Sequence, residues 1–181
     1  MRTTVSFLIG CVIGATGILM WVAETGAENT VPVEAPGRTP ALQMPVEGIA
    51  LEGLRSDFDE PRSGGRRHQA IDIRAPRGTP VVAVVDGTIR KLFTSAAGGL
   101  TIYHFDEREE TCYYYAHLDR YAAGIKEGMR VTRGSVIGYV GTTGNAPKST
   151  PHLHFAINRL PPTREWWKGD PIDPYPLLTG R

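Results

Sequence analysis

The chain has 181 residues, a formal net charge of +1 and a hydrophobic content of 41%, which fits one globular domain with appendages. The near-neutral charge and the lack of a long basic stripe argue against nucleic acid as the main partner. Its two cysteines, Cys11 and Cys112, are too few for a cysteine-ligated zinc site. Because one falls in an apolar segment and the other in an expected strand, no intrachain disulfide is predicted.

The N-terminal residues 5–23 contain no charged side chain, and nineteen residues are just enough to cross a bilayer as a helix. Arg2 precedes this run and Glu24 follows it, so the positive-inside rule places the rest of the chain outside the cytoplasm. The alternative is a cleaved signal peptide with a cleavage site at residues 25–27. We therefore expect residues 1–23 to form one hydrophobic helix that is either a membrane anchor or a signal segment.

Residues 24–45 contain prolines at regular intervals and few large apolar side chains, which predicts an extended linker. From residue 46 the sequence consists of short apolar runs separated by glycine-containing turns, and it has no long segment with the period of a helix. This pattern predicts an all-β barrel or sandwich over residues 46–160, followed by a C-terminal tail, residues 161–181, packed on the domain. The expected strands are residues 80–89, 100–105, 111–116, 135–140 and 152–157.

The strand expected at residues 152–157 presents two imidazoles on one face. His152 and His154 alternate with Leu153 and Phe155, so both rings leave the strand on the same side, about 6–7 Å apart. Two neutral imidazoles at this spacing suit a small metal site in which one ring is a ligand and the other handles protons.

A second candidate segment lies upstream at residues 68–72. Asp72 alternates with two isoleucines, and glycines and a proline bracket the run, so we favour a strand that puts His68 and Asp72 on one face. If this strand pairs near residues 152–157, His68, Asp72 and His154 converge on one ion. Two nitrogens and one carboxylate oxygen are typical of catalytic zinc and leave a fourth position for water. The alternative is that His68 and Asp72 each bond only within their own turn.

Two histidines remain. His117 is expected where a tyrosine-rich strand ends, a place from which proton-handling residues are often delivered; the alternative is an edge histidine bonded to Asp119. His104 has no partner pattern in the sequence, and we interpret it as structural.

The ordered set His68-x-x-x-Asp72, Tyr115-Ala116-His117-Leu118 and Pro151-His152-Leu153-His154-Phe155 resembles the lysostaphin-type zinc endopeptidases of bacterial cell walls. The resemblance covers about residues 62–158, including the glycine-containing stretches at 75–81, 86–87, 136–138 and 141–145. It implies an antiparallel barrel-sandwich hybrid fold. It also implies one zinc ion (Zn2+) per chain, held by His68, Asp72 and His154, with His117 and His152 as the catalytic pair.

By this resemblance, the expected function is zinc-dependent hydrolysis of the peptide cross-links of bacterial peptidoglycan. The expected partners are wall stem peptides, the membrane through the N-terminal segment, and a regulatory protein; a monomer is expected. The expected location is the periplasmic side of the cell envelope, anchored in the inner membrane or released after signal cleavage. Some family members have lost ligands and only bind and activate other wall hydrolases. Because all five polar positions are present here, we favour the enzyme.

Two departures from the family pattern stand out. Ala70 occupies a position that is usually glycine, and its methyl group could narrow the approach of the metal. Some members also carry an oxyanion-stabilising tyrosine shortly before the first histidine. This chain has arginines in that stretch, so we expect Arg62 or Arg67 to take that role and Arg66 to be solvated.

Overall fold

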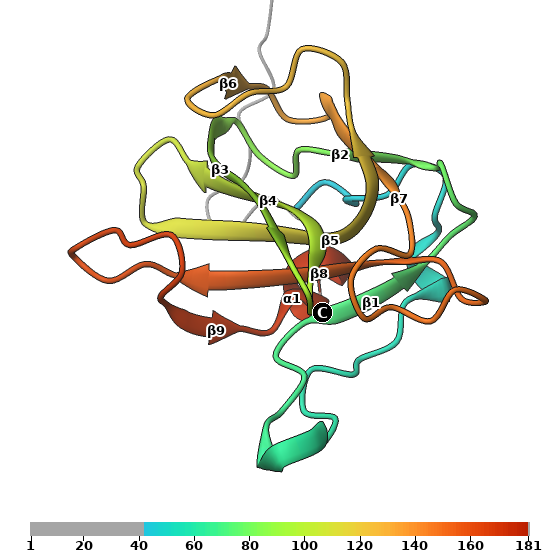
Figure 1. Cartoon of the computed structure of the whole chain (residues 1–181). Helices are drawn as coiled ribbons and strands as arrows, with labels where there is room; N and C mark the ends of the chain where they lie inside the picture. Colours follow the sequence, from blue (N-terminus) through green and yellow to red (C-terminus); the bar gives the residue numbers. More distant parts are fainter. Residues whose placement is uncertain (1–41, 181) are drawn as a thin grey trace, which may run out of the picture. The chain divides into compact units, whose positions relative to one another are not determined.

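The computed structural model describes residues 42–180 of the chain (Figure 1). The expected N-terminal hydrophobic helix and almost all of the proline-rich linker lie outside the described residues. Within residues 42–180, no helix is long and apolar enough to cross a membrane.

The described residues form a β-rich fold with very little helix. Two short 3-10 turns, η1 (Leu51–Gly53) and η2 (Ser63–Gly65), precede the sheet, and one short helix, α1 (Pro174–Thr179), follows it. The strands are β1 (Ile71–Arg74), β2 (Pro80–Val82), β3 (Gly87–Ser95), β4 (Gly99–Asp106), β5 (Thr111–Tyr121), β6 (Arg130–Val131), β7 (Val136–Val140), β8 (His152–Arg159) and β9 (Asp170–Ile172).

All strand pairings of the described residues are antiparallel, which confirms the predicted antiparallel all-β class. The strand order is β1-β8-β5-β4-β3-β6, with β7 joining β2 to β5 and β9 lying beside β8. The sheet is not closed as a barrel, because β1 and β6 lie at opposite ends of this order and do not pair. The reason lies in β5, which pairs with β8 over residues 111–116 and with β7 over residues 118–121. This change of partner branches the sheet instead of closing it.

The alternation of side chains along β1 and β8 separates the core from the opposite face of the sheet. Ile71 and Ile73 of β1, and Leu153 and Phe155 of β8, are at most 2% exposed and belong to the main hydrophobic core. Successive side chains of a strand point to opposite faces. The intervening polar residues of the two strands therefore project together from the face that is turned away from this core.

The C-terminal residues pack against the edge of the sheet. Strand β9 pairs with β8, and Leu178 of α1 is 2% exposed and joins the main core. The ring of Trp166 lies 4.6 Å from that of Tyr103, beside a small buried cluster, whereas Trp167 is 59% exposed. Of these two neighbouring tryptophans, Trp166 therefore packs at the edge of the cluster and Trp167 is open to solvent.

Candidate active site

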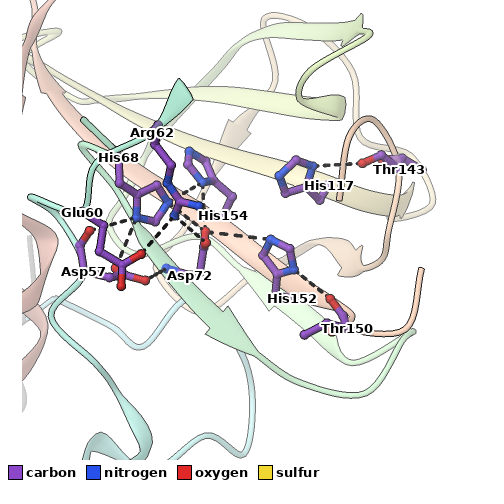
Figure 2. Close-up of polar contacts among 10 residues, drawn as sticks. All are labelled: Asp57, Glu60, Arg62, His68, Asp72, His117, Thr143, Thr150, His152 and His154. Carbon is purple, nitrogen blue, oxygen red and sulfur yellow. Dashed lines mark hydrogen bonds and ion pairs between the residues drawn. The ribbon is translucent and has the colours of Figure 1, made fainter. Parts of the chain in front are cut away.

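The side chains of His68, Asp72 and His154 meet on the outer face of β1 and β8 (Figure 2). Asp72 and His154 are directly opposite each other in the β1–β8 register. His68 Nε2, His154 Nδ1 and Asp72 Oδ1 are each 3.0 Å from the other two atoms. The predicted convergence of these three residues is therefore present, with the donor atoms at the corners of a small triangle.

Contrary to the prediction, His68 does not lie on the same strand as Asp72. Strand β1 begins only at Ile71, and Gln69 has a left-handed backbone (φ 55°) that breaks the expected alternation. His68 N donates a hydrogen bond to the Glu60 carbonyl oxygen (2.9 Å) and Gln69 N to that of Phe58 (2.8 Å). His68 therefore comes from a loop that folds back on the preceding segment.

Asp57, which the sequence did not single out, lies behind the His68 ring. The carbonyl oxygen of Asp57 is 3.1 Å from His68 Nδ1, and its carboxylate Oδ1 is 3.4 Å from the same nitrogen. When Nδ1 donates its hydrogen to this carbonyl, Nε2 keeps its lone pair for a metal. No local motif marks Asp57, because it lies in an acidic loop eleven residues before His68.

The triangle fits a small cation such as zinc. Two imidazole nitrogens and one carboxylate oxygen are a typical donor set for a catalytic zinc, whose ligand atoms lie roughly 3.3 Å apart in tetrahedral geometry. Within the described part of the chain, these three residues form a group that could hold a metal ion, because their ligand atoms all lie within 4.8 Å of one another. Ala70 is fully buried and the triangle forms beside it.

The local charges keep Asp72 ionised. Burial favours the neutral acid, but hydrogen bonds from His154 and His68 outweigh it and hold the pKa of Asp72 well below its usual range. Burial likewise disfavours the charged form of His68, but Asp57 and Asp72 outweigh it and raise the pKa of His68 to about 9. The cluster is therefore a carboxylate-rich environment that favours a bound cation.

Arg62 reaches the second oxygen of Asp72. Its Nη2 lies 3.2 Å from Asp72 Oδ2 and 3.7 Å from Glu60 Oε2, so Asp72 offers Oδ1 to the histidines and Oδ2 to the guanidinium. Arg67 instead bonds Asp59 at 3.0 Å. Of the two arginines expected near the site, Arg62 is the one that contacts a candidate ligand.

His117 and His152 lie together on the other side of Asp72 from Asp57 and Glu60 (Figure 2). Their ring centroids are 5.0 Å apart, and His152 Nε2 lies 3.9 Å from Asp72 Oδ1. His152 Nδ1 is 2.9 Å from the Thr150 carbonyl oxygen, and His117 Nδ1 is 2.9 Å from that of Thr143. Each carbonyl can accept only an N–H, so each neutral ring carries its hydrogen on Nδ1 and leaves Nε2 as a proton acceptor.

The surroundings of His117 differ from the prediction in two ways. Strand β5 continues past it to Tyr121, and His117 itself has a left-handed backbone (φ 60°), an uncommon conformation that is found at functional sites. Its partner is Thr143 and not Asp119, which bonds Arg77. Burial and the nearby His154 lower the pKa of His117 to about 4, so the ring is neutral at pH 7.

An open cleft of about 1030 Å³ connects these groups, and all five predicted site residues line it: His68, Asp72, His117, His152 and His154. His104 is not among the lining residues. It is fully buried, with Nδ1 3.4 Å from the hydroxyl of Tyr115. The interpretation of His104 as structural agrees with this position.

An antiparallel sheet with a candidate His–Asp–His metal site beside a histidine pair is the arrangement expected of the lysostaphin-type metallopeptidases. The chain belongs to Peptidase family M23, which it matches over residues 66–174.

Three relatives illustrate the likeness. The L-Ala–D-Glu endopeptidase of Bacillus subtilis is 37% identical over 131 residues, which are 68% of this chain and 39% of that protein. The DD-carboxypeptidase/endopeptidase Mpg of Neisseria meningitidis is 42% identical over 50% of this chain and 20% of its own length. The catalytic domain of lysostaphin from Staphylococcus simulans superposes with a TM-score of 0.59 at 28% identity, covering 71% of this chain and 94% of that domain. The chain thus spans less than half the length of these two curated relatives.

Proposed function

We propose that this protein is a zinc-dependent endopeptidase that hydrolyses peptide cross-links of bacterial peptidoglycan. The observation that carries the proposal is the triangle of His68, Asp72 and His154, with atoms 3.0 Å apart and two tautomerically fixed histidines beside it. The family and the names of its relatives support a wall peptide as the substrate.

In this proposal, His68 Nε2, Asp72 Oδ1 and His154 Nδ1 hold one zinc ion per chain. Zinc bound there would polarise the scissile carbonyl and lower the pKa of a water molecule toward about 7. His68 is kept in place by Asp57, and Asp72 by Arg62, so the donor atoms are held before any metal arrives.

The histidine pair is proposed to move the protons. Nε2 of neutral His152 or His117 accepts a proton from the attacking water and returns it to the leaving amine as the peptide C–N bond breaks. The other ring, in its protonated form, would donate a hydrogen bond to the oxyanion. The carbonyls of Thr150 and Thr143 fix the ring orientations that these transfers need. Both rings lie on the cleft side, where the substrate must enter.

The wider organisation is part of the same proposal. Residues 1–23 would be a membrane anchor or signal segment, 24–45 a linker, 46–160 the peptidase domain and 161–181 a packed tail. The protein would act as a monomer on the periplasmic side of the envelope, with stem peptides as substrate and a regulatory protein as an additional partner.

The experiment is digestion of purified cross-linked wall by the full chain, with zinc content determined on the same samples. We expect close to one zinc per chain and new amino termini that mass spectrometry assigns to one peptide bond of the wall. His154→Ala serves as the control without activity. A folded, zinc-loaded chain that releases no new termini would contradict the proposal and favour the non-catalytic activator.

A further inference from the structure

The charges that line the cleft are distributed unevenly. Asp, Glu, Arg and Lys side chains among the described lining residues all come from the segment 53–74, whereas the lining residues from 97 onward carry none of them. That segment supplies five arginines and three acidic groups; we call its arginines the arginine wall: Arg55, Arg62, Arg66, Arg67 and Arg74. One wall of the cleft is therefore rich in guanidinium groups, and the other is uncharged apart from the histidines.

The acidic lining residues of the segment 53–74 already have partners. Asp72 contacts two histidines and Arg62, Glu60 contacts Arg62, and Asp57 contacts His68. On the arginine side, Arg62 is engaged by Asp72 and Arg67 by Asp59. The lining part of the segment 53–74 therefore carries more positive charge than its three carboxylates neutralise.

Within the described range 42–180, Arg55 and Arg74 are the arginines of the wall whose side chains make no ion pair or hydrogen bond. Arg74 lies on β1 two residues after Asp72, so its side chain leaves the strand on the same face as that ligand. In the β1–β8 register Arg74 is opposite His152, just as Asp72 is opposite His154. Arg74 therefore lines the same cleft as His152 and His154, from the neighbouring strand.

We propose that Arg55 and Arg74 form a carboxylate-binding subsite, so that the preferred substrate is a stem peptide with a free carboxylate on the side of the scissile bond facing this wall. A guanidinium binds a carboxylate through two parallel hydrogen bonds. A peptide cross-link made only of glycine has no carboxylate side chain, so it would leave both arginines without partners. The inference rests on the proposed peptidase function, since it concerns the same cleft.

The test compares a cross-linked stem peptide with free carboxylates to the same peptide with its carboxylates converted to carboxamides. Binding is measured by calorimetry on the metal-free full chain, where no hydrolysis occurs, and kcat/KM on the zinc-loaded chain. We expect the carboxylate form to bind about 10- to 100-fold more tightly, as for a charge-assisted hydrogen bond. Peptides amidated at one carboxylate at a time then identify the group that is bound.

In the variants Arg74→Gln and Arg55→Gln, the ratio of kcat/KM for the carboxylate peptide to that for the carboxamide peptide should fall toward one, mainly through KM. Arg74→Lys should restore part of this ratio. Arg108→Gln is the matched control, because Arg108 is exposed in the β4–β5 turn and is not among the lining residues. It should keep the preference of the parent chain.

The two proposals fail separately. If the parent chain hydrolyses both peptides with equal kcat/KM, or if the preference survives in both glutamine variants, the subsite is refuted and the peptidase function stands. If the chain binds the carboxylate form selectively and hydrolyses neither peptide, the subsite stands and the peptidase function falls. Equal binding of both forms by an inactive chain refutes both.

Discussion

Asp57 lies against the Nδ1 edge of His68, on the side of the ring opposite Asp72. Its carbonyl oxygen is 3.1 Å and its carboxylate 3.4 Å from Nδ1, while His68 Nε2 is 3.0 Å from Asp72 Oδ1. The carboxylate of Asp57 also accepts a hydrogen bond from the main-chain N–H of Asp72 (3.4 Å). One residue thus holds two candidate ligands, which makes it a positioning residue for the metal site.

We therefore expect Asp57→Asn to weaken zinc binding about 10- to 100-fold, which is the typical cost of removing a group that orients a metal ligand. The measurement is competition with a chromophoric chelator. Asp59→Asn is the control, because Asp59 bonds only Arg67 among the described contacts. Equal zinc affinity in Asp57→Asn and the parent would mean that the carbonyl alone positions His68.

His154→Ala and Asp72→Ala should each lose bound zinc together with activity while keeping the fold. Both side chains lie on the face turned away from the core, so their removal leaves no cavity in the packed interior. Zinc content by mass spectrometry and circular dichroism on the same samples give the two readouts. Full zinc occupancy in either variant would refute the ligand assignment.

His152→Ala and His117→Ala should reduce turnover by a factor of about 10² to 10⁴, the usual contribution of a general acid or base, while zinc content stays near that of the parent. Turnover is measured on cross-linked wall peptide. If purified His152→Ala contains no zinc and purified His154→Ala does, the roles of the two β8 histidines are reversed.

Gly99→Ala tests the support beneath His117. Gly99 has φ +65°, and a Cβ there would lie 2.4 Å from the Thr143 carbonyl carbon, next to the oxygen that fixes the His117 ring. Gly134 has a similar φ of +84° with nothing within 4 Å of the added atom, so Gly134→Ala carries the backbone strain alone, about 1–3 kcal/mol. Urea unfolding should show a larger loss of stability for Gly99→Ala, with a fall in turnover that Gly134→Ala does not share.

His104 should make the stability of the domain depend on pH. Its complete burial, opposed only in part by Asp106 and Asp86, lowers its pKa from 6.5 to about 4. Between these values the unfolded chain binds a proton that the folded chain does not. Stability from this group is therefore present above pH 6.5 and is lost as pH falls toward 4, by about 3 kcal/mol since a tenfold change in proton affinity is about 1.4 kcal/mol.

The measurement is the free energy of unfolding in urea from pH 4.5 to 8 for the parent and for His104→Gln, which removes the titrating group. The variant should show a shallower pH dependence and, because His104 lies outside the cleft, should keep most of its activity at pH 7.5. Parallel pH profiles would show that burial of His104 does not control the acid sensitivity.

The sequence could predict the part of the site that depends on strand alternation. Asp72 among isoleucines and His154 among Leu153 and Phe155 belong to two strands with one apolar face each, and pairing of those strands brings the polar faces together. The sequence also indicates His117 and His152 as candidates. It does not indicate their carbonyl partners, because the positions of Thr143 and Thr150 depend on how the turn between β7 and β8 folds.

Other features could not be derived from local pattern. The left-handed Gln69 removes His68 from the strand, and glutamine gives no signal for this conformation. Asp57 becomes visible only when the loop folds back. The branching at β5 depends on long-range pairing with β7 and β8, which periodicity within one strand does not report. Alternation thus predicts faces, whereas tertiary packing decides which faces meet.

The candidate ligands Asp72 and His154 are 82 positions apart in the chain but directly opposite in the sheet. A cation held between them would cross-link β1 to β8, the one strand that pairs with β1 among the residues that the structure describes. Metal at a hundred times its dissociation constant would then raise the unfolding free energy by about 2.7 kcal/mol. Metal loss and detachment of this four-residue edge strand become one coupled event, so the melting temperature of the domain would report the free zinc concentration around it.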